Sequence, residues 1–277
     1  MSSSPLCNGR TISRTIKRGT PSMSLEGKVA FITGASRGIG RGIARLLAEQ
    51  GMKVAVNGRS DGAQRVANEL TATGHTARAF IGDISDKAQV EAMIQQAEDE
   101  LGPLWLLVNN AGVINFAPTV DMPEADWDKT FDVNIKGVFL CSQAALRYMQ
   151  PRKAGRIVNI SSIASEIVRT ERIAYCASKA AVNHFTRCLA VEVAPLGITV
   201  NCICPGMTHT DMLEEAMTSG GSKPENLLAT IPMGKFAVSE DHAHLVAYFA
   251  SEEAGHITGQ VIRVDGGQSQ FMPYAVG

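Results

Sequence analysis

The chain lacks the features that mark several large classes of protein. No apolar run approaches the roughly 18 residues that a membrane-spanning helix needs, so we expect no membrane span. The chain has no dense basic run and its formal net charge is −1, which argues against a nucleic-acid partner. The six cysteines show no paired spacing, and we interpret them as buried, reduced thiols in a reducing compartment. His242 and His244 have the wrong spacing for one helix face, so no metal site is expected.

The first 23 residues differ in composition from the rest of the 277-residue chain. They hold four basic residues, many serines and threonines, and no acidic residue. This composition is typical of an organelle transit peptide, which would place the protein in a mitochondrial or plastid matrix. No strong amphipathic helix is visible there. We therefore favour the alternative, a disordered tail on a cytoplasmic protein, followed by one folded domain over residues 24–277.

Apolar, β-branched runs alternate with helix-length amphipathic segments from residue 28 onward. The runs lie at residues 28–33, 53–57, 76–81, 104–109, 155–161, 198–204 and 260–264. Alternation of this kind implies right-handed crossovers and a mainly parallel sheet that is covered by helices on both faces. In such sheets the ligand binds outside the carboxyl ends of the strands. The sequence therefore predicts an α/β domain with its site at that edge.

A glycine-rich stretch, Thr33 to Gly40, follows the first run and opens a helix with apolar residues at helical spacing. Glycine permits a tight turn and a close approach of the backbone to a ligand. The helix N-terminus beyond it offers unpaired N–H groups to phosphate oxygens. The spacing is G-x-x-x-G-x-G rather than the usual G-x-G-x-x-G, so by itself the stretch also fits a turn that binds nothing.

The second run ends without the acidic residue that usually binds the ribose 2′-hydroxyl of NAD. Arg59 stands in that place, Asp61 is the first acid after it, and Arg37 lies in the glycine-rich stretch. Two guanidinium groups facing the adenosine ribose would hold a 2′-phosphate by charge-assisted bonds, which favours NADP over NAD. The alternative is that both arginines are solvated surface charges.

Two more turns follow strands at the expected edge. After the third run, Asp83 can accept a bond from an adenine amino group while Ile84 covers the ring, although Asp83 equally fits the start of a helix. After the fourth run, the small residues of Asn110-Ala111-Gly112 let the backbone lie against a ribose, although a purely structural turn explains them as well.

The fifth run leads to a set of three reactive side chains. Ser162 follows the run, Tyr175 stands thirteen residues later, and Lys179 lies four residues after the tyrosine on the same helix face. Tyrosine has an ordinary pKa near ~10, and a nearby ammonium group lowers it by stabilising the phenolate. A serine hydroxyl can bond the same substrate oxygen. A lone Tyr-x-x-x-Lys would usually be a surface pair, but this one accompanies a serine and a cofactor-type loop.

In order and spacing, these motifs resemble the short-chain dehydrogenase/reductase family over residues 26 to about 268. The motifs are Thr33-Gly34-x-x-x-Gly38-x-Gly40, Asn109-Asn110-Ala111-Gly112, Asn134, Ser162, Tyr175-x-x-x-Lys179 and Pro205-Gly206. Members that look most similar are the 3-oxoacyl-[acyl-carrier-protein] reductases and related NADP-dependent carbonyl reductases. The resemblance implies a single Rossmann-type doubly wound domain with a seven-stranded sheet. It also implies hydride transfer between NADP(H) and a ketone or secondary alcohol, the chemistry of dehydrogenases that act on CH–OH donors.

The resemblance also implies roles for single residues. Ser162 would orient the carbonyl, Tyr175 would donate the proton, and Lys179 would bind the nicotinamide ribose and lower the tyrosine pKa. Asn134 would hold a water that extends the proton relay. The residues expected to bind the cofactor are Gly34, Ser36, Arg37, Gly38, Ile39, Gly40, Arg59, Asp83, Ile84, Asn110, Ala111, Gly112, Tyr175, Lys179, Pro205, Gly206 and Thr208. Two long helices, at about 123–149 and 173–195, would form a homotetramer.

The natural substrate stays open at this point. An acyl-carrier thioester in fatty-acid synthesis, a sugar or polyol, and a small ketone are all compatible with the family. An NADPH-sensing regulator without turnover is an alternative of another class, but it would need a damaged catalytic set. By analogy, residues 163–172 face the substrate. The segment contains Glu166, Arg169, Glu171 and Arg172. An arginine there could meet an acidic substrate or an acyl carrier, and a solvated loop with self-paired charges fits at least as well.

Overall fold

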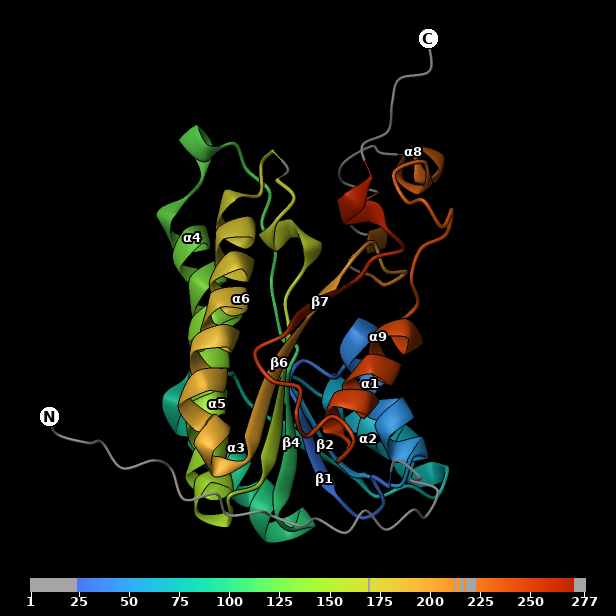
Figure 1. The fold of residues 1–277 in the computed structure, drawn as a ribbon. Helices are drawn as coiled ribbons and strands as arrows, with labels where there is room; N and C mark the ends of the chain where they lie inside the picture. Colours follow the sequence, from blue (N-terminus) through green and yellow to red (C-terminus); the bar gives the residue numbers. More distant parts are fainter. Residues whose placement is uncertain (1–23, 169, 212, 215–216, 218–222, 272–277) are drawn as a thin grey trace, which may run out of the picture.

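The computed structural model describes residues 24–168, 170–211, 213–214, 217 and 223–271, so the predicted tail lies outside the described residues. Its centre is a sheet of seven parallel strands in the order β3-β2-β1-β4-β5-β6-β7 (Figure 1). The strands are β1 (Val29–Ile32), β2 (Lys53–Gly58), β3 (Ala77–Ile81), β4 (Leu104–Asn109), β5 (Gly155–Ile160), β6 (Ile198–Pro205) and β7 (Val261–Val264). Each apolar run of the sequence coincides with one of them to within one residue at either end, and the predicted fold class is confirmed.

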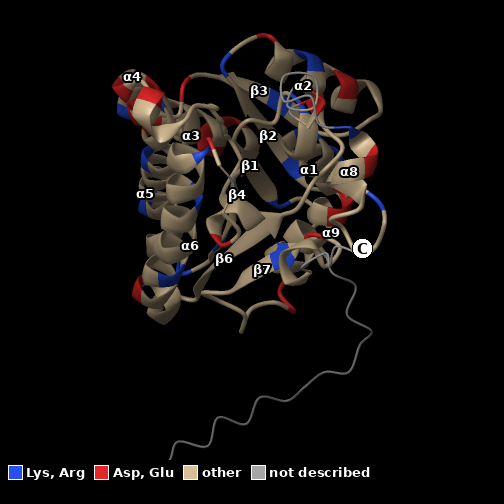
Figure 2. Cartoon of the chain, turned by 90° about the horizontal axis from the view of Figure 1, so that it is seen from above, with Lys and Arg blue, Asp and Glu red and all other residues tan. Residues whose placement is uncertain are grey.

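Helices cover both faces of the sheet (Figures 1 and 2). One layer consists of α1 (Gly38–Glu49), α2 (Gly62–Ala72) and α9 (Ser239–Ala250). The other consists of α3 (Lys87–Leu101), α5 (Gly137–Arg152) and α6 (Ile173–Val193). Shorter elements are α4 (Glu124–Phe131), α8 (Pro224–Leu228), a π-helical turn (Asp132–Lys136) and 3₁₀ turns at Thr119–Asp121, Ile163–Ser165, Ala194–Leu196 and Gln268–Gln270.

Strand β1 shows how the sequence builds two cores at once. Successive side chains of a strand point to opposite faces of the sheet. Val29 and Phe31 accordingly belong to the core under α3, α5 and α6, while Ala30 and Ile32 belong to the core under α1, α2 and α9. All four are at most 1% exposed. A strand buried on both faces must be apolar throughout, which is why these runs are continuous rather than alternating.

The strand order fixes where a ligand can bind. From β1 the chain adds β2 and β3 on one side, and it then returns to place β4 on the other side of β1. The loops after β1 and β4 therefore diverge and leave a crevice at the carboxyl edge of the sheet. The glycine-rich stretch and Asn110-Ala111-Gly112 are those two loops.

Two sequence-based expectations need correction. The helix predicted over 123–149 is interrupted, because α4 and α5 are joined by the π-helical turn. The cysteines are only partly as expected: Cys141, Cys202 and Cys204 are free and buried, whereas Cys188 is free and exposed on α6. Within the described residues, no helix combines the length and the apolar character needed to cross a membrane.

Candidate active site

The glycine-rich loop is held tightly against the loop after β4. Gly34 and Gly38 have positive φ angles of 63° and 56°, a backbone conformation that residues with a Cβ atom rarely adopt. A Cβ on Gly34 would lie 2.7 Å from Ala111 Cα. A Cβ on Gly40 would lie 2.5 Å from the Gly34 carbonyl oxygen and would also collide with the amide of Asn110. Glycine at these positions is therefore needed for the two loops to meet.

Asn110 and Thr33 lock this arrangement with hydrogen bonds. The Asn110 side-chain amide donates to the carbonyl oxygens of Thr33 (2.9 Å) and Gly34 (3.1 Å). In return, the Thr33 hydroxyl accepts from the backbone N–H groups of Asn110 (2.9 Å) and Ala111 (3.0 Å). Helix α1 begins within the glycine-rich loop, at Gly38. The side chain of its N-cap residue, Arg37, makes no capping hydrogen bond to the first turn. The first N–H groups of α1 are thus left for an anion.

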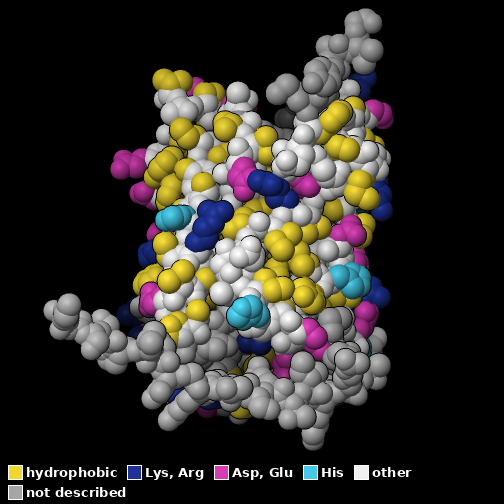
Figure 3. Space-filling model, viewed as in Figure 1, with side chains coloured by type: hydrophobic (Ala, Val, Ile, Leu, Met, Phe, Trp, Pro, Cys, Tyr) yellow, Lys and Arg dark blue, Asp and Glu magenta, His cyan; other side chains and the backbone are white. Residues whose placement is uncertain are grey.

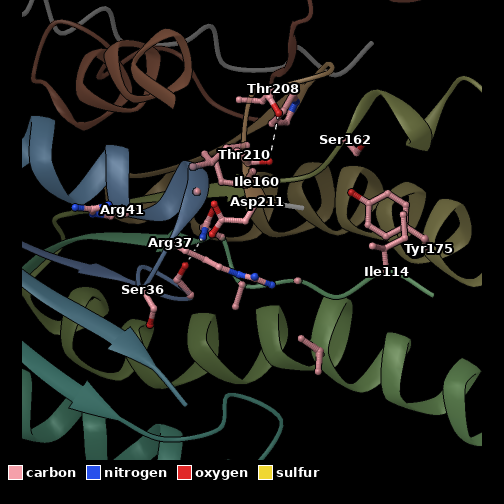
Figure 4. Close-up of a pocket in the computed structure, with 18 of the residues that line it drawn as sticks. Ser36, Arg37, Arg41, Ile114, Ile160, Ser162, Tyr175, Thr208, Thr210 and Asp211 are labelled. Atoms are coloured by element: carbon pink, nitrogen blue, oxygen red, sulfur yellow. Dashed lines mark hydrogen bonds between the residues drawn. The ribbon is translucent and has the colours of Figure 1, made fainter. Parts of the chain in front are cut away.

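A cavity of about 920 Å³ opens above these loops (Figure 4). That volume is ample for a cofactor together with a small substrate. The predicted site residues that line it are Gly34, Ser36, Arg37, Gly38, Ile39, Arg59, Asp83, Ile84, Asn110, Ala111, Gly112, Ser162, Tyr175, Lys179, Pro205, Gly206 and Thr208. The two that do not line it are Gly40, which packs against Asn110, and Asn134, which lies behind the loop after β4.

Asn134 is completely buried in the π-helical turn, a distortion that is frequent at functional sites. Its side-chain oxygen accepts from the Val113 backbone N–H (2.8 Å), and its amide donates to the Val113 carbonyl (2.9 Å) and the Ser178 hydroxyl (3.0 Å). The side chain therefore clamps the loop that carries Gly112. The water-holding role that the resemblance implies stays a prediction.

Ser162, Tyr175 and Lys179 meet at one end of the cavity. Ser162 follows β5, and Tyr175 and Lys179 lie on the first two turns of α6. The Tyr175 hydroxyl is turned toward Ser162 (Figure 4), and the hydrogen bond between them is one influence on the tyrosine pKa. The Lys179 ammonium lies 5.7 Å from the centre of the Tyr175 ring and donates to the Ile160 carbonyl at 2.9 Å. Three proton-bearing groups thus converge as the spacing predicts.

Burial controls the titration of this group. It raises the pKa of Tyr175, and the hydrogen bond with Ser162 and the charge of Arg172 only partly oppose it. Burial also lowers the pKa of Lys179 to about 8. Burial dominates the pKa of Tyr175, and the role of Lys179 in lowering that pKa, which the resemblance implies, stays a prediction. At neutral pH the phenol is therefore the protonated form, which is the form that can donate a proton.

The opposite end of the cavity is rich in arginine. Arg37 and Arg59, which the sequence singled out, line it together with Arg41 and Arg65, which it did not. Arg41 pairs with Glu69 (2.7 Å) and Arg65 pairs with Asp61 (2.8 Å), so these two charges are partly balanced. Arg59 is 63% exposed and its only described acidic neighbour is Asp83, at 3.9 Å. This loose pair leaves the Arg59 guanidinium able to meet another anion.

Asp83 has the structural role in the turn that the sequence allowed, and its adenine-binding role stays a prediction. Its carboxylate accepts from the Ser85 backbone N–H (2.9 Å) and hydroxyl (2.7 Å), so it does shape the turn before α3. Burial raises its pKa, but these bonds and Arg59 outweigh that effect and the pKa is lowered. Asp83 and Ile84 nevertheless line the cavity, where an adenine ring is expected.

The threonine after β6 lines the cavity and also bonds within the protein, and its cofactor-binding role stays a prediction. The Thr208 hydroxyl donates to the Gly206 carbonyl (3.1 Å) and lies 2.8 Å from Nε2 of His242, a fully buried residue of α9. It is Thr210, two residues later, that lies beside the glycine loop: a Cβ on Gly38 would be 3.5 Å from its methyl group. Thr210 lines the cavity and was missed. The second threonine of Thr208-His209-Thr210 was the only signal for it.

The wall near Tyr175 also includes residues that the motifs did not mark as site residues. They are Ile114, Phe116, Ile163, Ile167, Arg172, Met207 and Leu213. They come from three loops that each follow a strand, after β4, β5 and β6. Their position after a strand was the one sequence signal that could have marked them as site residues. Apolar loop residues belong to no recognisable motif, so that signal alone did not identify them. The wall is therefore mostly apolar, with a guanidinium at its rim.

Comparison with known proteins assigns the family. The family model described as short chain dehydrogenase matches residues 28–219, more than half of the chain. The chain belongs to the short-chain dehydrogenase family. The motif-based resemblance is thereby confirmed, and the short-chain dehydrogenases are oxidoreductases that use nicotinamide cofactors.

Similar proteins span nearly the whole of this short-chain dehydrogenase. The (2S)-[(R)-hydroxy(phenyl)methyl]succinyl-CoA dehydrogenase subunit BbsD of Thauera aromatica is 39% identical over 250 residues, 90% of this chain and 99% of that protein. The 3-oxoacyl-[acyl-carrier-protein] reductase FabG of Staphylococcus aureus is 40% identical over 242 residues, 87% of this chain and 97% of that protein. A gluconate 5-dehydrogenase of Burkholderia cenocepacia, solved with NADP and tartrate, has a TM-score of 0.85 and 33% identity, and the match covers 90% of this chain and 98% of that chain.

The cavity of this short-chain dehydrogenase fits a nicotinamide dinucleotide by its own geometry. Gly34 and Gly38 line the cavity without side chains, so the backbone of the glycine-rich loop can lie close to a ligand there. The uncapped start of α1 suits a pyrophosphate. The arginines at one end and the phenol at the other suit the two ends of such a cofactor.

Proposed function

We propose that this short-chain dehydrogenase interconverts a ketone and a secondary alcohol with NADP(H). The observation that carries the proposal is the convergence of Ser162, Tyr175 and Lys179 in the same cavity as the glycine loop. A hydroxyl, a protonated phenol and an ammonium around one point form a proton-transfer site for a carbonyl oxygen. When bound there, the cofactor supplies or accepts the hydride.

The side chains divide the remaining work among them. The hydroxyls of Ser162 and Tyr175 bind the carbonyl oxygen and polarise it. Tyr175, whose pKa is raised by burial, is protonated at neutral pH and gives its proton to the oxygen as negative charge develops there. Lys179, 5.7 Å from the ring, then stabilises the phenolate that remains. Asn134 keeps the loop of Gly112 in place beside Lys179.

The choice of NADP rests on the arginine-rich end of the cavity. No acid ends β2, and Arg59 stands there and pairs loosely with Asp83 at 3.9 Å. An acid at that place would bond a ribose 2′-hydroxyl, whereas a guanidinium suits a 2′-phosphate. The gluconate 5-dehydrogenase that resembles this chain was solved with NADP. An Arg59→Asp variant should shift preference toward NAD, and an unchanged ratio of kcat/KM for the two cofactors would show that Arg59 does not meet the 2′-phosphate.

A spectrophotometric panel tests the reaction itself. NADPH consumption is followed with small ketones, 3-oxoacyl thioesters and ketosugars, and NADP⁺ reduction with the matching alcohols. We expect turnover with at least one ketone and its loss in Ser162→Ala. Tight NADPH binding without turnover on any member would instead support an NADPH-sensing protein. A preference for acyl-carrier thioesters would favour a 3-oxoacyl-[acyl-carrier-protein] reductase, which the 40% identity to FabG makes the first alternative.

We also propose that the protein works as a cytoplasmic homotetramer. Apolar side chains are exposed on the helices that were expected to pack between copies: Phe139 on α5 is 45% exposed and Val191 on α6 is 78% exposed. A second apolar area lies over β7 and α9 (Figure 3), where Ile262 and Tyr248 are 37% and 36% exposed. Two separate faces suit a four-chain assembly with two kinds of contact. Sedimentation velocity on the wild type and on Val191→Glu tests it.

A further inference from the structure

The cavity wall near Tyr175 combines apolar surface with one guanidinium. Ile114, Phe116, Ile163 and Ile167 line this part, which we call the substrate pocket, and Arg172 stands at its rim. Arg172 precedes Tyr175 by three residues at the N-cap of α6. Its positive charge reaches the reacting group, since it is one of the influences that lower the pKa of Tyr175 against the effect of burial. The position of Arg172 is therefore relevant to whatever binds above the phenol.

Arg172 is held in place by the opposite wall. Its guanidinium carbon lies 4.8 Å from the centre of the Phe116 ring, a cation–π contact. The backbone of the same two segments is joined by a hydrogen bond from the Ala117 N–H to the Glu171 carbonyl at 3.0 Å. Glu171 has a positive φ of 62°, an uncommon conformation for a residue with a side chain. The turn that presents Arg172 is thus fixed against the loop after β4 rather than extended into solvent.

The neighbouring acids do not neutralise this charge. Glu166, in the same loop, accepts hydrogen bonds from two guanidinium nitrogens of Arg263 on β7. Among the described residues, no carboxylate forms an ion pair with Arg172, and its guanidinium contacts the Phe116 ring. Glu166 thus pairs outside the loop, while Arg169, another charge of the loop, lies outside the described residues. A planar guanidinium that is fixed by a ring and lacks a carboxylate is suited to bind one from a ligand.

We propose that the substrate is an oxo acid or hydroxy acid whose carboxylate is bound by Arg172, with its apolar part against the substrate pocket. This proposal rests on the proposed function. In the reduction, the ketone carbon gains a hydride from NADPH and the oxygen gains the Tyr175 proton, so the products are the secondary alcohol, NADP⁺ and a tyrosinate that is reprotonated from water. The carboxylate is unchanged. Arg172 and Tyr175 line the same cavity, so one small substrate can place its acid group at the guanidinium and its reacting carbon at the phenol.

The test compares each acid with its uncharged ester. The probes are acetoacetate and 3-oxohexanoate, each with its methyl ester, and kcat/KM is measured with NADPH. We expect the wild type to prefer the acids, and Arg172→Gln to lower kcat/KM for the acids by about tenfold or more while changing the esters little. Arg172→Lys should give an intermediate loss, because it keeps the charge without the planar fork. Phe116→Leu should also weaken the acids selectively.

Arg78→Gln is the matched control for the loss of one positive charge. Arg78 lies on β3, is 60% exposed and pairs with Glu100, so this variant should leave both kinds of substrate unchanged. If the wild type has the same kcat/KM for an acid as for its ester, or if Arg172→Gln lowers kcat/KM for both equally, this proposal is wrong while the proposed function stands. If no probe is reduced and Ser162→Ala changes nothing, the proposed function falls.

A binding measurement separates the two outcomes without turnover. Calorimetric titration of 3-hydroxybutyrate into the enzyme–NADPH complex, a pair of two reduced ligands that cannot react, should show binding that is weakened about tenfold or more in Arg172→Gln, and methyl 3-hydroxybutyrate should bind the two proteins alike. Inorganic phosphate and acetate are titrated as competitors. Competition by phosphate alone that depends on Arg172 would assign the guanidinium to a phosphate ester and overturn the carboxylate.

Discussion

Replacement of Asn134 by alanine tests how the structure connects stability to the cofactor site. The side chain is completely buried and makes three hydrogen bonds, two to the backbone of Val113 and one to Ser178. Alanine leaves the Val113 N–H and C=O groups without these partners, whereas the Ser178 hydroxyl keeps its bond to the Tyr175 carbonyl. An unsatisfied buried group costs about 1–3 kcal/mol, so we expect a loss of about 2–4 kcal/mol in the free energy of unfolding.

The same change should weaken cofactor binding. Gly112 lies between Asn134 and Lys179, since a Cβ on it would be 3.4 Å from the side chains of both. A loosened loop would therefore disturb the wall where the nicotinamide ribose is expected.

Urea unfolding followed by circular dichroism gives the stability, and NADPH fluorescence titration gives the dissociation constant. Asn115→Ala is the matched control from the same loop, because that amide makes only a 3.3 Å bond to the Asp126 carbonyl and should cost under about 1 kcal/mol. If Asn134→Ala is as stable as Asn115→Ala and binds NADPH normally, the clamp that we infer does not exist. A pH profile of kcat that alone changes would favour the water-holding role.

Three further predictions concern other parts of the fold. Gly40→Val should abolish NADPH binding, measured by fluorescence, because its side chain would collide with Asn110; retained binding would refute the close packing of the two loops. His242 has its pKa lowered from 6.5 to about 4 by burial, so between these pH values the unfolded chain binds more protons and stability falls as pH falls. From pH 7.5 to pH 5 the wild type should lose about 2 kcal/mol of its free energy of unfolding through this residue, and His242→Gln should not show that part of the loss in urea unfolding. Equal pH dependence of the unfolding free energy in the two proteins would contradict this prediction. Glu98→Ala should cost about 2–3 kcal/mol, because it removes two bonds from Arg152 and one from the Leu104 N–H; calorimetry showing an unchanged melting temperature would contradict a stabilising role of this partly exposed ion pair.

The sheet could be predicted from the sequence because its strands are buried on both faces. Continuous apolar, β-branched runs such as Val29–Ile32 indicate buried strands when they alternate along the chain with amphipathic helices. The runs alone do not determine the order of the strands, because each of them is apolar on both faces and fits several neighbours. Most of the cavity was also predictable, because motif residues at strand ends must share one edge of a parallel sheet.

The details that the sequence did not reveal depend on contacts between distant segments. Nothing local shows that the Thr208 hydroxyl lies 2.8 Å from Nε2 of His242, which comes from α9, or that Thr210 lies beside the glycine loop. The π-helical turn accompanies the bonding of Asn134 to Val113, 21 residues away, so local helix periodicity could not reveal it. Similarly, the raised pKa of Tyr175 follows from burial, which Tyr-x-x-x-Lys spacing does not measure.

The proposed reaction depends on the Tyr175 phenol giving its proton to an oxygen that is also bound by Ser162, beside bound NADPH. The most direct measurement is a single turnover of enzyme preloaded with NADPH and mixed with a reducible ketone, for wild type and Tyr175→Phe, with NADPH affinity determined in parallel. We expect the variant to bind NADPH with unchanged affinity and its hydride-transfer rate to fall by about 10²- to 10⁴-fold. Transfer at the wild-type rate in Tyr175→Phe would contradict the assignment of Tyr175 as the proton donor.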